Sequence, residues 1–120
     1  MARLSFPQRG EVFLVNFDPT VGAEIKKVRP AIVIQNDSAN RLSPIIIIAA
    51  ITSKFDDELY PTEVWIRAGE AGLKQDSVIV LNHIRSVDRR RILKKLGKVG
   101  ELTLKRTDVA IKISLGLVDL

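Results

Sequence analysis

Two stretches of this sequence border residues that could act together on a phosphodiester. Residues 29–37 begin with Arg29, and the apolar run 44–51 is followed by Thr52. Both stretches read as strands, and we expect them to pair, which would bring Arg29 and Thr52 to the same open end of a stiff support. A guanidinium is a planar donor that stays charged at any working pH and fits phosphate oxygens. The pair therefore predicts charge stabilisation rather than covalent or metal-assisted chemistry.

RNA can be cleaved without a metal when the ribose 2′-hydroxyl attacks the adjacent phosphorus. Negative charge then grows on the non-bridging oxygens and on the leaving 5′-oxygen, and one well-placed donor there is worth roughly 3 kcal/mol. Arg29 is the best such donor in the chain, and Thr52 would add a hydroxyl to the same phosphate. Residue types alone make this a weak signal, because a strand Thr usually reflects β-propensity and an Arg beside Pro usually lies on the surface.

The sequence leaves the general base open. Glu24 lies five residues before Arg29 and could orient it, accept the 2′-hydroxyl proton or simply be solvated. Histidine is the residue type that exchanges protons most readily near neutral pH, and His83 is the only one in the chain. A lone His in an apolar strand is more often structural, so Glu24, His83 and solvent all remain candidates.

Other side chains could contact RNA. Aromatic rings stack on splayed bases, so Phe17 and Phe55 are candidates, although core packing is the stronger expectation for Phe17. The polar and charged candidates are Asn36, Ser53, Gln75, Ser77, His83 and Arg85. The acidic triplet 56–58 lacks the ligand spacing of a cation site, and we expect neither a metal nor another cofactor.

Composition limits the class of protein. The chain has 120 residues, enough for one domain, and 46% of them are hydrophobic. The absence of Cys excludes disulfides, thiolate zinc sites and thiol catalysis. The N-terminus lacks the apolar region of a secretory signal, and the longest apolar run is far shorter than the ~20 residues of a membrane span. We therefore expect a cytoplasmic protein.

Positive charge is unevenly distributed. The net charge is +5, and nine Lys and Arg residues lie between positions 85 and 106. Such a cluster attracts nucleic acid, but it is equally compatible with a solvated helix face or an acidic protein partner.

The first two thirds of the chain read as strands separated by turns. Strands are expected at residues 11–17, 28–35, 45–51, 62–66, 77–81 and 83–87. Residues 36–44 should form a loop or a short helical turn. Asp88 would cap a short helix over 90–95, and 98–99 would be a last short strand.

Helical spacing of apolar residues begins near position 101 and ends at 115 or 116. Leu102, Val109 and Ile113 share one face, and Leu104 and Ile111 lie on a neighbouring one. Strands followed by one long helix predict a single α+β domain, residues 1–120, in which a small curled antiparallel sheet packs against the helix. The apolar strands and wide helical stripe exceed what this small core needs, so we expect a homodimer.

Seven segments, in this order, resemble the MazF/PemK family of toxin endoribonucleases from bacterial toxin–antitoxin systems. They cover nearly the whole chain and are specific as a set, although each alone is weak evidence. The segments are Arg9-Gly10-Glu11-Val12, residues 17–24, residues 29–37, residues 50–53, Pro61-Thr62-Glu63-Val64, residues 73–78 and residues 84–89. The pattern looks especially like the Bacillus-type branch of the family.

The resemblance implies a homodimer built on an SH3-like barrel with a C-terminal helix. It also implies metal-independent cleavage of single-stranded RNA at a short sequence, leaving a 2′,3′-cyclic phosphate and a 5′-hydroxyl. The family's catalytic Arg, Thr and Glu fall on Arg29, Thr52 and Glu24. The expected partner is a cognate acidic antitoxin whose C-terminal segment folds into the RNA groove.

The sequence departs from the family pattern at two places. The family's Gly-Ser-Glu-Gln loop reads Gly22-Ala23-Glu24-Ile25, and the branch usually has Gln where this chain has Asn82-His83. These changes affect the preferred RNA sequence more than the reaction type. Two alternatives stay open: a CcdB-like toxin that inhibits gyrase on the same fold, and a non-catalytic RNA-binding module.

Overall fold

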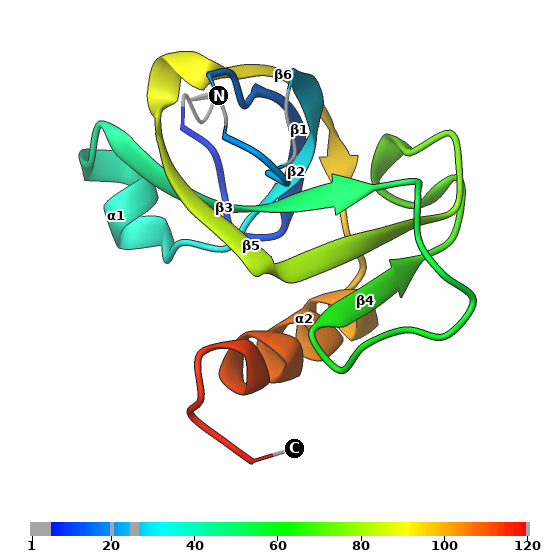
Figure 1. The fold of residues 1–120 in the computed structure, drawn as a ribbon. Coiled ribbons are helices and arrows are strands. Elements are labelled where there is room, and N and C mark those ends of the chain that lie inside the picture. The colour runs from blue at the N-terminus through cyan, green and yellow to red at the C-terminus, as the bar shows by residue number, and fades with distance from the viewer. Residues whose placement is uncertain (1–5, 20, 25–26, 120) are drawn as a thin grey trace.

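Six strands form one antiparallel sheet in the computed structural model of the chain, which describes residues 6–19, 21–24 and 27–119 (Figure 1). The strands are β1 (Glu11–Asn16), β2 (Val28–Val33), β3 (Ile45–Thr52), β4 (Glu63–Ile66), β5 (Ser77–Asp88) and β6 (Ile92–Lys98), arranged in the order β4-β5-β3-β2-β1-β6. The other described elements are the helices α1 (Asp37–Leu42) and α2 (Glu101–Ser114) and the 3-10 turns η1 (Glu70–Gly72) and η2 (Arg89–Arg91). The expected α+β fold is confirmed. The sheet curls strongly but keeps β4 and β6 as edges, so the barrel is not closed.

β3 lies in the interior of the sheet and is covered on both faces, as its unbroken apolar sequence predicts. Ile46 and Ile48 face one core, inside the curl of the sheet, where they pack with Phe17. Ala49 and Ile51 face the second core, which also contains Ala110 of α2. Full burial of one such Ile is worth roughly 2 kcal/mol. Thr52 is therefore carried at the end of a strand anchored on both sides.

β5 is one long strand with an irregularity near its middle, where the sequence suggested two segments. Its pairing with β3 shifts between Ala49, which faces Ile84, and Ala50, which faces Val80, so residues 81–83 are passed over. A bulge bends a strand and increases its twist, and Figure 1 shows the curvature of β5. The bend lets one strand serve both cores, with Ile79 in the second core and Val87 inside the curl.

The segment after β5 differs from the sequence prediction. Asp88 is a cap, since its Oδ1 accepts the Arg90 backbone N–H at 2.8 Å, but the turn ends at Arg91. The side chain of Arg90 also donates to this carboxylate, which lowers the pKa of Asp88. The helix predicted over 90–95 is wrong: the chain continues as edge strand β6, with Lys94 and Lys95 exposed. Lys residues are typical of edge strands because they block further pairing.

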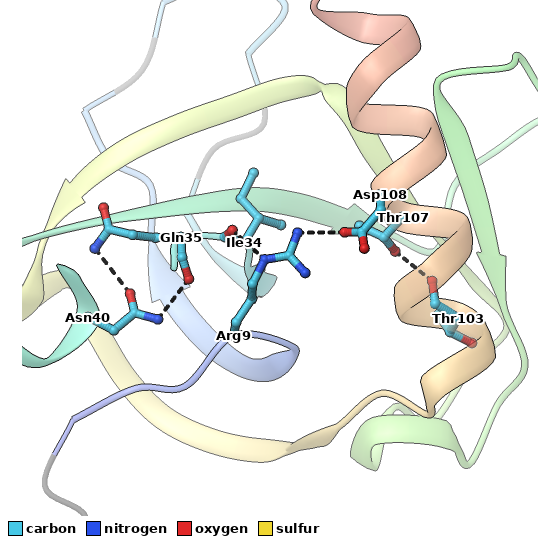
Figure 2. Close-up of polar contacts among 7 residues, drawn as sticks. All are labelled: Arg9, Ile34, Gln35, Asn40, Thr103, Thr107 and Asp108. Carbon is cyan, nitrogen blue, oxygen red and sulfur yellow. Dashed lines mark hydrogen bonds and ion pairs between the residues drawn. The ribbon is translucent and has the colours of Figure 1, made fainter. Parts of the chain in front are cut away.

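α2 has the predicted extent, and of its two predicted apolar faces only the one with Leu104 and Ile111 packs against the core. Thr103, Thr107 and Ala110 are its buried residues, whereas Leu102 is 62% and Val109 is 55% exposed. The Thr107 hydroxyl donates to the Thr103 carbonyl at 2.8 Å (Figure 2), so its burial leaves no unmet donor. Within the described residues, no helix has the length and apolarity needed to cross a membrane.

Arg9 fastens α2 to the sheet. Its Nη2 lies 2.6 Å from Asp108 Oδ1 of α2, and its Nε donates to the Ile34 carbonyl, just beyond β2, at 2.8 Å (Figure 2). Its backbone N–H donates to Asp37 Oδ1 at 2.7 Å. Charged hydrogen bonds of this kind are stronger than neutral ones. One side chain thereby joins the N-terminal segment, the end of β2 and the helix.

A buried amide pair joins β2 to α1. Gln35 Nε2 donates to Asn40 Oδ1 at 3.0 Å, and Asn40 Nδ2 donates to the Gln35 carbonyl at 2.9 Å (Figure 2). The guanidinium of Arg89 then donates to the Ser43 carbonyl at the end of α1. These contacts fix the connection between β2 and β3, the two strands expected to carry the site.

Candidate active site

A groove of about 620 Å³ opens at the end of the sheet where β2 begins and β3 ends. All three residues predicted to be catalytic line it, together with three of those predicted to bind RNA. These six residues are Arg29, Thr52, Glu24, Ser53, Gln75 and Ser77. The structure therefore brings together residues that lie up to 53 positions apart in the sequence.

Strand pairing explains why Arg29 and Thr52 lie at the same end of the sheet. β2 and β3 pair antiparallel with Ala31 opposite Ala50 and Ile32 opposite Ala49. This pairing ends at Ala31 and Ala50, so Arg29 and Thr52 lie two residues beyond it on their strands. By strand alternation, Arg29 shares a face with Ala31 and Thr52 shares a face with Ala50. Both residues line the groove, so both can donate to a phosphate bound there.

Arg29 and Thr52 both present hydrogen-bond donors to the groove. Arg29 is exposed, and within the described residues its guanidinium makes no ion pair or hydrogen bond. Thr52 is half-buried, and its Oγ1 accepts the Lys54 backbone N–H at 3.1 Å. Among the described residues, its own hydroxyl hydrogen has one acceptor, the Lys54 carbonyl at 3.5 Å, which is a long contact for a hydroxyl donor.

Glu24 is held by its own turn. Its Oε1 accepts the backbone N–H of Val21, and its N–H donates back to the Val21 carbonyl at 3.2 Å. This reciprocal contact fixes the carboxylate at the rim of the groove. A carboxylate has two oxygens, so the one that Val21 does not use can accept a further proton or hydrogen bond.

Three Lys residues make the groove strongly cationic. Lys54, Lys74 and Lys94 line it together with Arg29, against the single carboxylate of Glu24. The sequence indicates Lys94 only as part of the basic stretch 85–106, and it gives Lys54 and Lys74 no predicted role. Lys54 directly follows Ser53 and Lys74 directly precedes Gln75. Both of these neighbours were predicted to bind RNA, and they are the sequence signal that could have pointed to the two lysines. Lys94 was hidden by the wrong prediction of a helix.

The part of the groove lined by residues 72–75 depends on a close backbone crossing. η1 and β6 approach each other so closely that a Cβ on Gly97 would lie 2.6 Å from the carbonyl carbon of Ala71. A Cβ on Gly72 would likewise collide with the Leu96 carbonyl, and Gly72 has a φ of +74°. Glycine is required at both positions. The crossing places Lys74 and Gln75 on the same groove as Lys94.

Phe55 lies beside the groove rather than in it. It lines a neighbouring pocket that shares Ser53 and Lys54 with the groove and also includes Tyr60. Phe55 is half-buried and Tyr60 is exposed, so rings are accessible where the groove continues past Thr52. This position suits the expected stacking on a base.

Besides Phe55, four residues predicted to bind RNA do not line the groove. Phe17 is fully buried inside the curl, which contradicts a stacking role. Asn36 caps α1 by accepting the Ala39 N–H at 2.9 Å, and Arg85 donates to the Phe17 carbonyl at 2.5 Å. His83 is half-buried in the bulge of β5. Turn chemistry and core packing explain the first three residues better than RNA contact does.

The chain belongs to the family described as PemK-like, MazF-like toxins of type II toxin–antitoxin systems, whose family model matches residues 8–115. It is 42% identical over 112 residues to the endoribonuclease EndoA of Bacillus subtilis (strain 168), covering 93% of this chain and 97% of that protein. The family expected from the sequence is therefore confirmed, and the Bacillus relative agrees with the expected branch.

Solved structures agree with the fold. MazF from Deinococcus radiodurans superposes with a TM-score of 0.80 at 28% identity, covering 92% of this chain and 97% of that one. An endoribonuclease solved in complex with its cognate antitoxin, from a mycobacterial species, gives a TM-score of 0.78 at 18% identity and covers 95% and 99% of the two chains. The second likeness is one of fold alone.

Proposed function

We propose that this chain is a type II toxin that acts as an endoribonuclease on single-stranded RNA, with Arg29 and Thr52 as the groups that stabilise the reacting phosphate. One observation supports the proposal: Arg29 of β2 and Thr52 of β3 line the same cationic groove. The family match and the endoribonuclease name of the Bacillus relative support the same reaction.

The reaction requires no metal at these residues. The 2′-hydroxyl loses its proton as its oxygen bonds to phosphorus, and the bond from phosphorus to the 5′-oxygen breaks. The departing 5′-oxygen takes a proton from solvent, which leaves a 2′,3′-cyclic phosphate and a 5′-hydroxyl. Arg29 donates to the non-bridging oxygens, where negative charge grows, and Thr52 donates to the same phosphate. Glu24, which lines the groove, is the proposed acceptor of the 2′-hydroxyl proton.

Partners follow from the groove and the surface. The cationic groove suits RNA and, in the inhibited state, an acidic antitoxin segment, since MazE–MazF complexes of the Deinococcus toxin are among the similar structures. Exposed Leu102, Val109 and Leu115 on and after α2 supply apolar surface for the expected homodimer. The place of action would be the cytoplasm, where bacterial mRNA is found.

The test uses purified protein, a long unstructured RNA and EDTA. Cleavage should persist in EDTA, and the new ends should be a cyclic phosphate and a 5′-hydroxyl. Arg29→Ala should lower the rate by about 100-fold or more, because a transition-state donor is lost. Arg41→Ala is the matched control, since Arg41 is an exposed Arg of α1 that does not line the groove. Equal rates for Arg29→Ala and the parent would refute the mechanism.

The gyrase alternative is decided in the same preparation. A CcdB-like toxin would inhibit DNA supercoiling and leave the RNA intact. The family match favours RNA cleavage, and so does the pairing of Arg29 with Thr52, which gyrase binding does not require.

A further inference from the structure

Two arginine side chains hold three consecutive backbone carbonyls where β1 ends. Arg85 Nη1 donates to the Phe17 carbonyl at 2.5 Å, and Arg91 Nη1 donates to the Asn16 carbonyl at 3.1 Å and also to the Asp18 carbonyl. Arg85 belongs to β5, whereas Arg91 belongs to η2 and directly precedes Ile92, which pairs with Val15 of β1. Both arginines are half-buried. Hydrogen bonds from a charged donor are stronger than neutral ones, which makes this an anchoring point.

The anchored segment is in turn joined to the residue that leads into β2. Phe17 N–H donates to the Lys27 carbonyl at 2.9 Å, and Lys27 N–H donates to Asp18 Oδ1 at 2.9 Å. Lys27 has a φ of +69°, an uncommon conformation for a residue with a side chain. Two bonds to one residue hold it in this conformation. Lys27 lies two positions before Arg29.

Glu24 and Arg29, the two proposed active-site residues, therefore depend on the same anchored backbone. This anchored backbone consists of residues 16–18 and Lys27, and we call it the base of the 17–27 connection. Glu24 lies between the anchored carbonyls and Lys27 in the sequence, and Arg29 lies two positions after Lys27, on β2. On its other side, β2 is fixed by the Gln35–Asn40 pair and by pairing with β3. At the end of β2 nearest the groove, the described contacts that fix the strand are its pairing with β1 and the base.

We propose that Arg85 and Arg91 are positioning residues for the endoribonuclease reaction, holding the base of the 17–27 connection so that Glu24 and Arg29 face the reacting phosphate. The inference rests on the proposed function. It gives these two arginines a role through backbone carbonyls rather than through contact with RNA.

Single substitutions separate positioning from charge. Arg91→Ala and Arg85→Ala remove the anchoring hydrogen bonds. Arg91→Lys keeps the positive charge but replaces the planar guanidinium with an ammonium, whose hydrogen bonds are less directional. Arg90→Ala is the matched control, because Arg90 sits in the same turn, is 90% exposed at its side chain and pairs only with Asp88 among the described residues. Asp18→Ala removes the hydrogen bond that Lys27 N–H donates to Asp18 Oδ1, so it weakens the base without removing a positive charge.

Two readouts are needed for each variant. Hydrogen exchange at the amides of Phe17 and Lys27, followed by NMR, reports directly on the base. Steady-state kcat and KM on a short RNA with one cleavage site report on the chemistry. A thermal melt and a circular dichroism spectrum show that each variant is folded.

Arg91→Ala, Arg85→Ala and Asp18→Ala should exchange the Lys27 amide at least tenfold faster and lower kcat by about tenfold, because small displacements of reacting groups are costly. KM should match that of Arg90→Ala, whose kcat stays within about twofold of the parent, and Arg91→Lys should recover part of the loss. If kcat is unchanged in Arg91→Ala and Arg85→Ala, the two arginines are not positioning residues, whether or not the amide hydrogen exchange of Lys27 becomes faster. A parent that leaves the RNA intact overturns the proposed function instead, and a loss carried by KM alone assigns the arginines to RNA binding.

Discussion

At the scale of single residues, the two proposed donors differ in how strongly their surroundings already engage them. Within the described residues the Arg29 guanidinium has no partner, so its donor fork can serve a phosphate without breaking an existing bond. Thr52 uses its oxygen to accept the Lys54 N–H at 3.1 Å but leaves its hydrogen poorly engaged. An oxygen that already accepts a hydrogen bond is polarised, which strengthens its own donation. The Lys54 turn therefore prepares Thr52 as a donor.

This arrangement predicts opposite results for two conservative changes at Thr52. Thr52→Ser keeps the hydroxyl, so kcat should stay within about threefold of the parent. Thr52→Val keeps the shape but removes the hydroxyl, so kcat should fall by about tenfold or more. Single-turnover cleavage of a short RNA measures both, with a thermal melt to show that β3 stays paired. If the Val variant cuts as fast as the Ser variant, Thr52 shapes the groove without donating to the phosphate.

At the scale of elements, the sequence predicts best where one pattern has one cause. The apolar run of β3 reflects burial alone, and this strand lies where it was expected. In the segment 90–95, the Asp88 cap is a true local signal for a helical turn, and it concealed the pairing of the following strand with β1. α2 was placed correctly, but its buried face also includes Thr103 and Thr107, and the Thr107 hydroxyl can be buried because it donates to the Thr103 carbonyl. Only contacts distant in the sequence reveal such outcomes.

The crossing of η1 and β6 was also invisible in the sequence, although the groove depends on it. A glycine in a charged strand reads as a weak point, whereas Gly97 is where the Ala71 backbone passes. The residues at the crossing, Gly72 and Leu96, line the groove together with Lys74 and Gln75. Glycine at positions 72 and 97 is therefore required for the backbone that forms this part of the groove.

Gly97→Ala should therefore destabilise the fold and disturb the groove. Its Cβ would lie 2.6 Å from backbone that cannot rotate away, an overpacking that costs about 1–3 kcal/mol. Chemical denaturation should show a lower midpoint with little change in slope, and RNA cleavage should fall at temperatures where the variant is still folded. Gly100→Ala serves for comparison, since its Cβ would have only Glu70 Oε2 nearby, at 3.7 Å. Equal stability of the two variants would show that η1 yields to the added methyl group.

At the scale of the whole molecule, the positive charge that matters is not the charge that clusters in the sequence. Several basic residues of the stretch 85–106 have structural roles: Arg89 and Arg91 donate to backbone carbonyls, and Lys95 pairs with Glu11. Of the lysines and arginines in that stretch, Lys94 alone lines the groove. The groove cations come from β2, β6 and the segments after β3 and η1. Folding, rather than local composition, assembles the field.

Salt dependence can separate these two kinds of charge. The logarithm of the affinity for single-stranded nucleic acid falls with the logarithm of salt concentration by about 0.7 per neutralised phosphate. Lys94→Gln should therefore weaken RNA binding and reduce that slope by about 0.7, because it removes one groove cation. Lys112→Gln removes the same charge from an exposed position on α2 that does not line the groove, and its slope should match the parent. Fluorescence anisotropy in the Arg29→Ala background, where cleavage is suppressed, measures both. Identical slopes for the two Lys variants would mean that RNA follows the overall charge of the surface and not this groove.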